Sequence, residues 1–321
     1  MKIVIPGGSG QVGAILSRAL RAEGHQVIVL ARSSTGQEGT VAWDGRTLGR
    51  WTDQLDGADA VINLAGRSVN CRYTPEHLRE MLESRVRSTE VVGQAIARAA
   101  RPPRTWLQMS TATIYAHRFD AANDDLEGRI GGTEPDAPAL WKKSVDIAIA
   151  WERALGEAPT PRTRKVALRT AVVLSPDRGG IFDVLMALTR RGLGGPVAGG
   201  AQYMSWIHDR DLVRSVKFLL ERGDLGGAVN VASPGPLPQA EFMTVLREAA
   251  QIRIGLPAAW WMAEVGAFLL RTETELLFKS RRVVPRRLLD AGFAFEFPRW
   301  PEAARDLVGR WKTEREVAGH R

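Results

Sequence analysis

Four closely spaced glycines are the clearest sign of chemistry in this sequence. The segment Gly7–Gly13 (GGSGQVG) satisfies G-x-G-x-x-G through Gly8, Gly10 and Gly13, and G-x-x-G-x-x-G through Gly7, Gly10 and Gly13. It follows a predicted strand and precedes a predicted helix, which is the context that gives the motif its meaning. Glycine permits a tight turn and close approach of phosphate, and free amides at a helix start attract anions. We therefore expect a dinucleotide pyrophosphate site, with a purely structural turn as the alternative.

The end of the second predicted strand indicates which dinucleotide binds. An NAD site places Asp or Glu there to hydrogen-bond the ribose 2′-hydroxyl. This chain instead has Leu30-Ala31-Arg32-Ser33, so no acid competes for that position. The Arg32 guanidinium can pair with a 2′-phosphate. We expect NADP (NADPH) in preference to NAD; a solvated surface arginine is the alternative.

A sheet must hold these residues, and short apolar runs indicate its strands. Continuous apolar runs that alternate with helical patterns are typical of buried parallel strands. The predicted helices are Gln11–Glu23, Pro75–Ala100, Leu140–Leu155 and Asp211–Glu221. The predicted strands are Lys2–Pro6, Gln26–Ala31, Ala60–Ala65, Thr105–Ser110, Lys165–Thr170 and Ala228–Ala232. The fold class is therefore α/β, a Rossmann-type doubly wound parallel sheet.

After Thr170 this alternation ends. We expect a dinucleotide-binding domain over residues 1–175, whose last strand comes from about 226–232, and a smaller C-terminal substrate lobe mainly over 176–321. The lobe contains a glycine-dense segment at Gly192–Gly200. Its predicted helices are Gln239–Ala250, about Ala258–Leu270 and Arg281–Ala291.

The composition is that of a globular protein of the reducing cytoplasm. The chain has 321 residues, 44% of them hydrophobic, and Cys71 is its only cysteine, which excludes an intramolecular disulfide. The longest apolar run, Leu256 to Leu270, is too short to span a bilayer. The net charge of +8 comes from arginines spread along the chain, which favours a solvated surface over nucleic-acid binding. We expect a cytoplasmic protein without nucleic-acid, membrane or metal partners.

Further stretches resemble one branch of the extended short-chain dehydrogenases/reductases. Asn63-Leu64-Ala65-Gly66 resembles the N-x-A-G element that lines the cofactor after the third strand. The stretches Gly194–Val197 and Gln202–His208 are the most specific, and Val284–Phe293 resembles that branch's small C-terminal module, expected at about 255–305. The chain is identified as a member of the atypical sugar-nucleotide-epimerase-like family, which has no settled substrate.

The resemblance implies a homodimer through the helices at 75–100 and 140–155, and a set of cofactor contacts. Arg85 also has a rationale of its own, because its guanidinium can reach a phosphate or ribose from the helix after the third strand. A surface helix arginine is the alternative. The implied contacts are Gly7, Gly10, Gln11, Val12, Arg32, Leu64, Ala65, Gly66, Glu80, Arg85 and Val172.

The resemblance also implies two catalytic candidates, Thr111 and Tyr115. They lie in Ser110–Ala116 (STATIYA), where Thr111 matches the hydroxyl that orients the substrate and Tyr115 lies close to it. A strand-end turn and a core tyrosine are the alternatives.

The usual Tyr-x-x-x-Lys pair, in which the lysine lowers the pKa of the phenol, is absent. None of the three tyrosines has a lysine four residues later. On the helix that should carry the pair, the two places fall to Trp141 and Val145 in one alignment and to Ser144 and Ala148 in the other.

Proton chemistry must then fall to another group. Tyr115, Lys142, Lys143 and His208 are candidates, each with a structural alternative. The leading hypothesis is an NADP-binding, epimerase-like oxidoreductase that acts on a small-molecule carbonyl or sugar-nucleotide substrate. A catalytically silent dinucleotide sensor or scaffold is the alternative, and an RNA-binding Rossmann protein rests on the charge alone.

Overall fold

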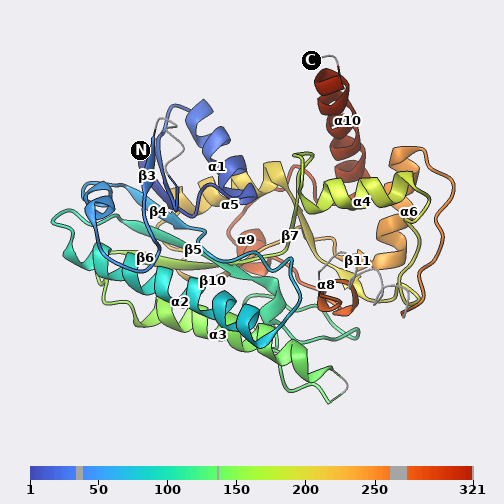
Figure 1. The fold of residues 1–321 in the computed structure, drawn as a ribbon, viewed down its shortest axis with the longest axis horizontal. Coiled ribbons are helices and arrows are strands. Elements are labelled where there is room, and N and C mark those ends of the chain that lie inside the picture. Colours follow the sequence, from blue (N-terminus) through green and yellow to red (C-terminus); the bar gives the residue numbers. More distant parts are fainter. Residues whose placement is uncertain (34–38, 136, 261–272, 320–321) are drawn as a thin grey trace.

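The computed structural model describes residues 1–33, 39–135, 137–260 and 273–319 (Figure 1). Seven parallel strands form its main sheet, in the order β10-β6-β5-β4-β1-β2-β3. The chain adds strands on both sides of β1, with β2 on one side and β4 on the other. Such a change of direction opens a crevice at the carboxyl ends of β1 and β4, where dinucleotides bind in folds of this kind. The strands are β1 (Lys2–Pro6), β2 (Gln26–Ala31), β3 (Thr40–Ala42), β4 (Ala60–Asn63), β5 (Thr105–Thr111), β6 (Arg164–Thr170) and β10 (Gly227–Val231).

Helices cover both faces of the sheet because alternate strand residues point to opposite sides. On one face, Ile3 and Ile5 of β1 pack in a cluster with α1 (Gln11–Ala22) and α5 (Asp209–Glu221). On the other, Val4 packs in a second cluster with α2 (Pro75–Arg98) and α3 (Ala139–Glu157). Figure 1 shows α2 and α3 side by side below the sheet. The predicted doubly wound fold is confirmed.

A smaller lobe lies beside the sheet, at the right of Figure 1. Its core contains Phe182, Trp206, Phe242 and Trp300, and the Phe242 and Trp300 rings stack with centroids 4.0 Å apart. Its helices are α4 (Ile181–Arg190), α6 (Gln239–Ala250) and α10 (Trp300–Gly319). Two short strand pairs complete it, namely β7 (Val172–Leu174) with β9 (Trp206–His208) and β8 (Tyr203–Met204) with β11 (Leu237–Pro238).

The C-terminal segment then returns to the carboxyl edge of the sheet. The backbone amide of Asn123 donates to Arg282 O (2.7 Å), and that of Val284 donates to Asn123 O (3.0 Å). These bonds hold residues 281–285 extended, so the predicted helix over Arg281–Ala291 is wrong in its first half. Only α9 (Arg286–Asp290) forms, after the one-turn helix α8 (Glu275–Phe278). Most of the helix predicted at about Ala258–Leu270 falls on residues 261–270, which lie outside the described residues.

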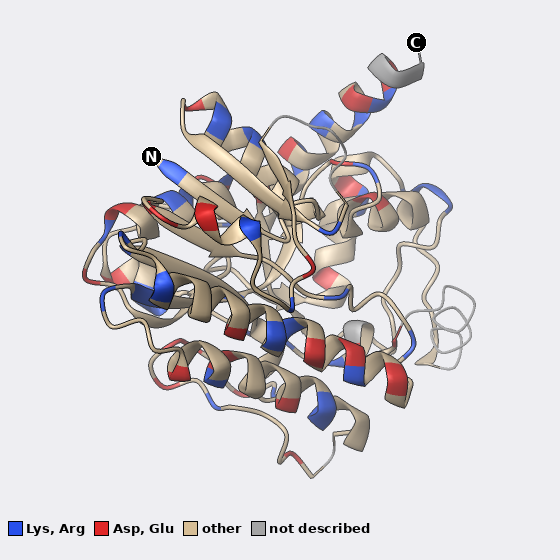
Figure 2. Ribbon diagram, turned by 60° about the vertical axis from the view of Figure 1, so that its left-hand side comes forward, with Lys and Arg blue, Asp and Glu red and all other residues tan. Residues whose placement is uncertain are grey.

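Figure 2 shows basic and acidic segments interspersed along the helices in view rather than gathered into blocks. Within the described part of the chain, no helix is both long and apolar enough to cross a membrane.

Candidate functional site

The glycine loop joins β1 to α1, and two of its glycines are required by packing. Gly7 has φ +74°, and a Cβ there would lie 2.7 Å from both the N and Cα of Ala65. A Cβ on Gly13 would lie 2.3 Å from the carbonyl oxygen of Gly8. The loop therefore holds α1 tightly against the sheet and against the segment after β4.

Gly10 has a different role, because the space where a side chain would stand is open. Its φ is −77°, and the nearest atom to an added Cβ is Gly7 O at 3.7 Å. It is the N-cap of α1, and no side chain caps the helix. Beside it, the buried Nε2 of Gln11 has no hydrogen-bond partner among the described residues. Three features therefore suit the binding of an anion here: open space, backbone amides that no side chain caps, and a side-chain N–H without a partner.

Arg32 lies on the same edge of the sheet as this loop. It directly follows β2, and Leu30 near the end of that strand accepts the backbone N–H of Gly7 at 2.9 Å. Its side chain is exposed and makes no hydrogen bond or ion pair with any residue that the structure describes. The guanidinium is therefore available for a ligand bound at the loop.

A cavity of about 250 Å³ opens beyond the ends of β4 and β5. Four of the predicted site residues line it together, namely Leu64, Gly66, Arg85 and Thr111. Buried Asn63 orients this wall, because its Oδ1 accepts the backbone N–H of Ala65 (3.1 Å) and its amide donates to Gln108 (2.9 Å).

Arg85 forms part of the cavity wall and is not a solvated surface arginine. Its guanidinium donates to the carbonyls of Met81 (3.1 Å) and Arg67 (3.0 Å) and lies 5.0 Å from the centroid of the Trp151 ring. Burial lowers its pKa to about 10. The residue brings a positive charge to the cavity while its bonds hold it in place.

Helix α3 presents Ser144, Ala148 and Trp151 to this cavity. Trp141 and Val145 instead line a second cavity of about 210 Å³. The structure thus agrees with the alignment that puts Ser144 and Ala148 at the two places of the usual Tyr–Lys pair.

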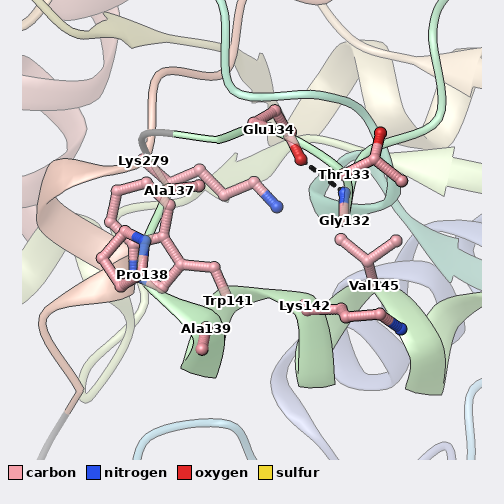
Figure 3. Close-up of a pocket in the computed structure, with 10 residues that line it drawn as sticks. All are labelled: Gly132, Thr133, Glu134, Ala137, Pro138, Ala139, Trp141, Lys142, Val145 and Lys279. Carbon is pink, nitrogen blue, oxygen red and sulfur yellow. Dashed lines mark hydrogen bonds between the residues drawn. The ribbon is translucent and has the colours of Figure 1, made fainter.

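Figure 3 shows the Lys279 side chain reaching across that second cavity towards Gly132 and Glu134. The ammonium of Lys142 points away from Lys279 and pairs with Asp146 at 2.6 Å. Lys143 is exposed. Neither Lys142 nor Lys143 lies at the wall of the larger cavity.

Tyr115 is in a buried polar network. It is 2% exposed, its hydroxyl donates to Asn230 (2.8 Å), and it accepts from Arg169 (3.0 Å). Arg169 in turn donates to both carboxylate oxygens of Glu152, at 2.9 and 2.7 Å. The cavity wall does not include Tyr115, which matches the core tyrosine that was its alternative.

His208, Glu80 and Val172 also lie away from the cavity wall. His208 is fully buried, caps α5 by accepting the Arg210 N–H, and contacts Asp306 through Nε2 at 3.0 Å. Glu80 is ion-paired with Arg67, and Val172 lies in β7.

Sequence reasoning missed three polar residues at and behind the cavity. Tyr73 lines it beside Ser144, and Ser144 donates to Glu275 at 2.5 Å. Glu275 is 1% exposed and lies 3.5 Å from Lys279. Burial and the nearby Glu275 charge raise the pKa of Tyr73 to about 12, while Ser144 and Arg281 oppose that shift. Ser144 was named in the sequence analysis only for its place in one alignment of the usual Tyr–Lys pair, and no local pattern indicated a role for Tyr73 or Glu275.

Comparisons with known proteins agree with this architecture. A model of the NAD dependent epimerase/dehydratase family matches residues 3–232, and one of a domain of unknown function (DUF1731) matches residues 260–307. The epimerase family protein SDR39U1 of Bos taurus is 32% identical over 314 residues, 96% of this chain and 100% of that protein.

Solved structures show the same relationship. The crystal structure of the human epimerase family protein SDR39U1 with NADPH has a TM-score of 0.82 at 28% identity, over 96% of this chain and 99% of that one. A nucleoside-diphosphate sugar epimerase from Corynebacterium glutamicum has a TM-score of 0.74 at 25% identity, over 99% of this chain and 61% of that one. The chain therefore belongs to the NAD-dependent epimerase/dehydratase family.

Proposed function

We propose that this protein binds NADP(H) in preference to NAD(H) and uses it in an epimerase-like oxidoreductase reaction on a carbonyl or sugar-nucleotide substrate. The observation that carries the proposal is the continuity between the phosphate loop and the cavity. Gly7 packs on Ala65, and the neighbours of Ala65 on both sides, Leu64 and Gly66, line the cavity. A ligand bound at the open side of Gly10 can therefore extend towards Thr111.

The residues present fit such a dinucleotide. The uncapped start of α1 and the unpartnered Gln11 amide supply donors for the pyrophosphate, and Arg32 supplies a positive charge for a 2′-phosphate. When bound, a nicotinamide nucleotide supplies or accepts a hydride. The relative from Homo sapiens, whose crystal structure is described as containing NADPH, supports the choice of the phosphorylated cofactor.

We place the substrate in the cavity beside Thr111. Its Oγ1 accepts the backbone N–H of Thr113 at 3.1 Å, so its own proton is left to donate to a substrate oxygen. The Corynebacterium glutamicum relative, described as a nucleoside-diphosphate sugar epimerase, favours a sugar nucleotide among the carbonyl-forming substrates.

A sensor or scaffold that binds the dinucleotide without chemistry is the second candidate. It is favoured by the absence of a phenol–lysine pair on the face of α3 that borders the cavity, where Ser144 and Ala148 stand. The two functions share the cofactor site and differ in turnover.

The test is a titration of the purified protein with NADP, NADPH, NAD and NADH, followed by melting temperature and nicotinamide fluorescence. Specific binding at a hundred times Kd stabilises the fold by about 2.7 kcal/mol, which is easily measured. We expect the phosphorylated pair to bind more tightly. No shift with any of the four at millimolar concentration would refute the cofactor site. Binding without oxidation or reduction of any carbonyl or sugar nucleotide would favour the sensor.

A further inference from the structure

A phenol reaches the cavity from the loop between β4 and α2. The position of Tyr73 in that loop is fixed by the C-terminal part of the chain, because its backbone N–H donates to Glu273 Oε2 at 3.1 Å. The adjacent Arg72 is 3.7 Å from the other carboxylate oxygen of Glu273. Tyr73 thereby lines the same cavity as Thr111, the predicted substrate-orienting hydroxyl.

Ser144 connects this phenol to a buried carboxylate. A serine hydroxyl has one proton, and Ser144 donates it to Glu275 Oε2 at 2.5 Å. The lone pairs of the same oxygen are left to accept the hydroxyl of the neighbouring Tyr73 while the phenol is neutral. Once the phenol ionises, the Ser144 hydroxyl can donate to it instead, which is why Ser144 lowers the pKa of Tyr73. Tyr73, Ser144 and Glu275 thus lie in one line of hydrogen-bonding groups that ends inside the protein.

We propose that Tyr73 is the acid–base residue of the cavity and that Ser144 and Glu275 are positioning residues that connect it to a proton reservoir. The carboxylate of Glu275 comes from residues 260–307, the domain of unknown function, so that domain would supply part of the active site. The inference deepens the proposed function and rests on it, because the proton exchanged belongs to the substrate of that reaction.

The proton movements balance in both directions. With an alcohol, the substrate hydroxyl gives its proton to the Tyr73 oxygen, the phenol proton passes to Ser144 Oγ, and the Ser144 proton passes to Glu275 Oε2. The carboxylate becomes a carboxylic acid, and the substrate carbon gives up its hydride to the oxidised nicotinamide nucleotide. With a carbonyl every movement is reversed: Glu275 first takes up a proton from solvent, that proton reaches the substrate oxygen through Ser144 and Tyr73, and the hydride would come from the reduced nicotinamide nucleotide.

The surroundings of Tyr73 suit a relay that stays protonated at rest. Burial and Glu275 raise its pKa to about 12, while Ser144 and Arg281 lower it and Cys71 raises it further. Arg85 faces the phenol from α2, and Lys279 faces Glu275 from its own segment. A phenol with so high a pKa does not ionise near neutral pH, so it passes a proton only when its own is accepted.

The coupling can be measured without turnover. In the full-length chain with ring-¹³C-labelled tyrosine, the Tyr73 signal is assigned by its loss in Tyr73→Phe. At pH 10.5, with folding verified by circular dichroism, we expect the phenol to be almost entirely protonated in the unsubstituted chain. Glu275→Gln removes a like charge and should lower the pKa of Tyr73, which raises the ionised fraction several-fold. Adding Ser144→Ala removes a hydrogen bond that favours the anion, so ionisation should fall again.

Glu273→Gln is the matched control, because Glu273 is also buried and contacts the Tyr73 backbone rather than its phenol, and glutamine keeps an oxygen that accepts the Tyr73 N–H and so holds the loop in place. It should leave the ionisation unchanged. If Glu275→Gln behaves like this control, Glu275 is not coupled to the phenol and the inference is overturned.

Turnover supplies the second readout, with NADPH and a panel of aldehydes, ketones and sugar nucleotides. Tyr73→Phe should lower kcat at least about 100-fold and leave the NADPH Kd unchanged, whereas Tyr203→Phe should keep full activity. Full turnover by Tyr73→Phe would overturn the inference while the proposed function stands. If no dinucleotide binds, the proposed function fails, and the titration still decides whether the three residues are coupled.

Discussion

Gly7 and Ala65 are in such close contact that a single methyl group on Gly7 would lie 2.7 Å from the backbone nitrogen of Ala65. The contact joins the glycine loop after β1 to the segment after β4, across the point where the strand order reverses. Gly7 also has φ +74°, a conformation that other residues rarely adopt. Two separate sequence motifs are therefore parts of one structural unit, and its geometry determines where a ligand can lie.

Two other glycines of that loop, Gly10 and Gly13, give a sharp test of the phosphate site. Gly10→Ala should lower dinucleotide affinity at least about tenfold, because the added methyl group occupies open space in front of the α1 amides. It should cost only about 1 kcal/mol of stability, the usual penalty of alanine at an N-cap position. Dinucleotide titration and thermal denaturation measure the two effects.

Gly13→Ala is the matched comparison. Its Cβ would lie 2.3 Å from Gly8 O, so we expect a loss of about 1–3 kcal/mol from overpacking. If Gly10→Ala instead destabilised the fold and left affinity intact, the open side of Gly10 would not be where phosphates bind.

The sheet could be predicted from sequence because its strands are buried on both faces and therefore read as continuous apolar runs. Tertiary contacts override local pattern elsewhere. Residues 281–285 have a helical pattern, yet backbone bonds to Asn123 and the Asn230 amide bond to Val284 O (2.9 Å) hold them extended. Helices α4 and α10 were missed, although α10 buries Ala303, Ala304, Leu307, Val308 and Trp311 at helical spacing.

The residues of the candidate site also fall into two groups, those that local sequence motifs indicate and those that only the tertiary structure brings together. Leu64, Gly66 and Thr111 lie in or next to short motifs at strand ends, and parallel strands bring their carboxyl ends to one edge. Ser144 and Glu275 are 131 residues apart, and no local pattern indicates that they meet. Tyr115 was chosen by motif, but its position after β5 directs it into the network with Asn230 and Arg169.

Arg32→Ala tests the preference between cofactors. Loss of a charge-assisted contact with the 2′-phosphate should weaken NADP binding by about 2 kcal/mol, roughly 30-fold, and leave NAD binding nearly unchanged. The melting temperature should stay constant because the side chain is exposed. Calorimetric titration with both cofactors measures the difference. Equal losses for NADP and NAD would contradict the 2′-phosphate role.

Tyr115→Phe separates a structural tyrosine from a catalytic one. Removing the hydroxyl leaves the buried Asn230 Oδ1 and one Arg169 N–H without this partner, which should cost about 1–3 kcal/mol. Dinucleotide affinity should not change, because Tyr115 does not line the cavity. Urea denaturation and fluorescence titration provide the two readouts. An unchanged stability with a loss of cofactor binding would mean that Tyr115 reaches the ligand after all.

An ion pair whose contribution to stability depends on pH joins the C-terminal helix α10 to helix α5, which packs on the sheet. Asp209, 4% exposed at the start of α5, accepts hydrogen bonds from Arg310 of α10 at 2.9 and 2.7 Å. Burial alone would raise the pKa of Asp209, but the hydrogen bonds and positive charge of Arg310 outweigh it and hold that pKa below its ordinary value. A carboxyl with a depressed folded-state pKa stabilises the fold above its unfolded pKa, near 4, and loses that contribution as the pH falls.

Asp209→Asn should therefore cost about 2 kcal/mol at pH 7, because Arg310 loses its two charge-assisted hydrogen bonds to Asp209 and keeps only the contact with Asp306 at 3.2 Å. The difference from the unsubstituted chain should narrow steadily as the pH falls below about 4, because the carboxyl takes up a proton in the unfolded chain there while the folded chain still holds it ionised. Urea denaturation at several pH values between 7 and 2.5 measures the difference, with Asp53→Asn, an exposed aspartate, as the control. A difference that stayed constant across this range would mean that Asp209 stabilises α10 through packing and not through its charge.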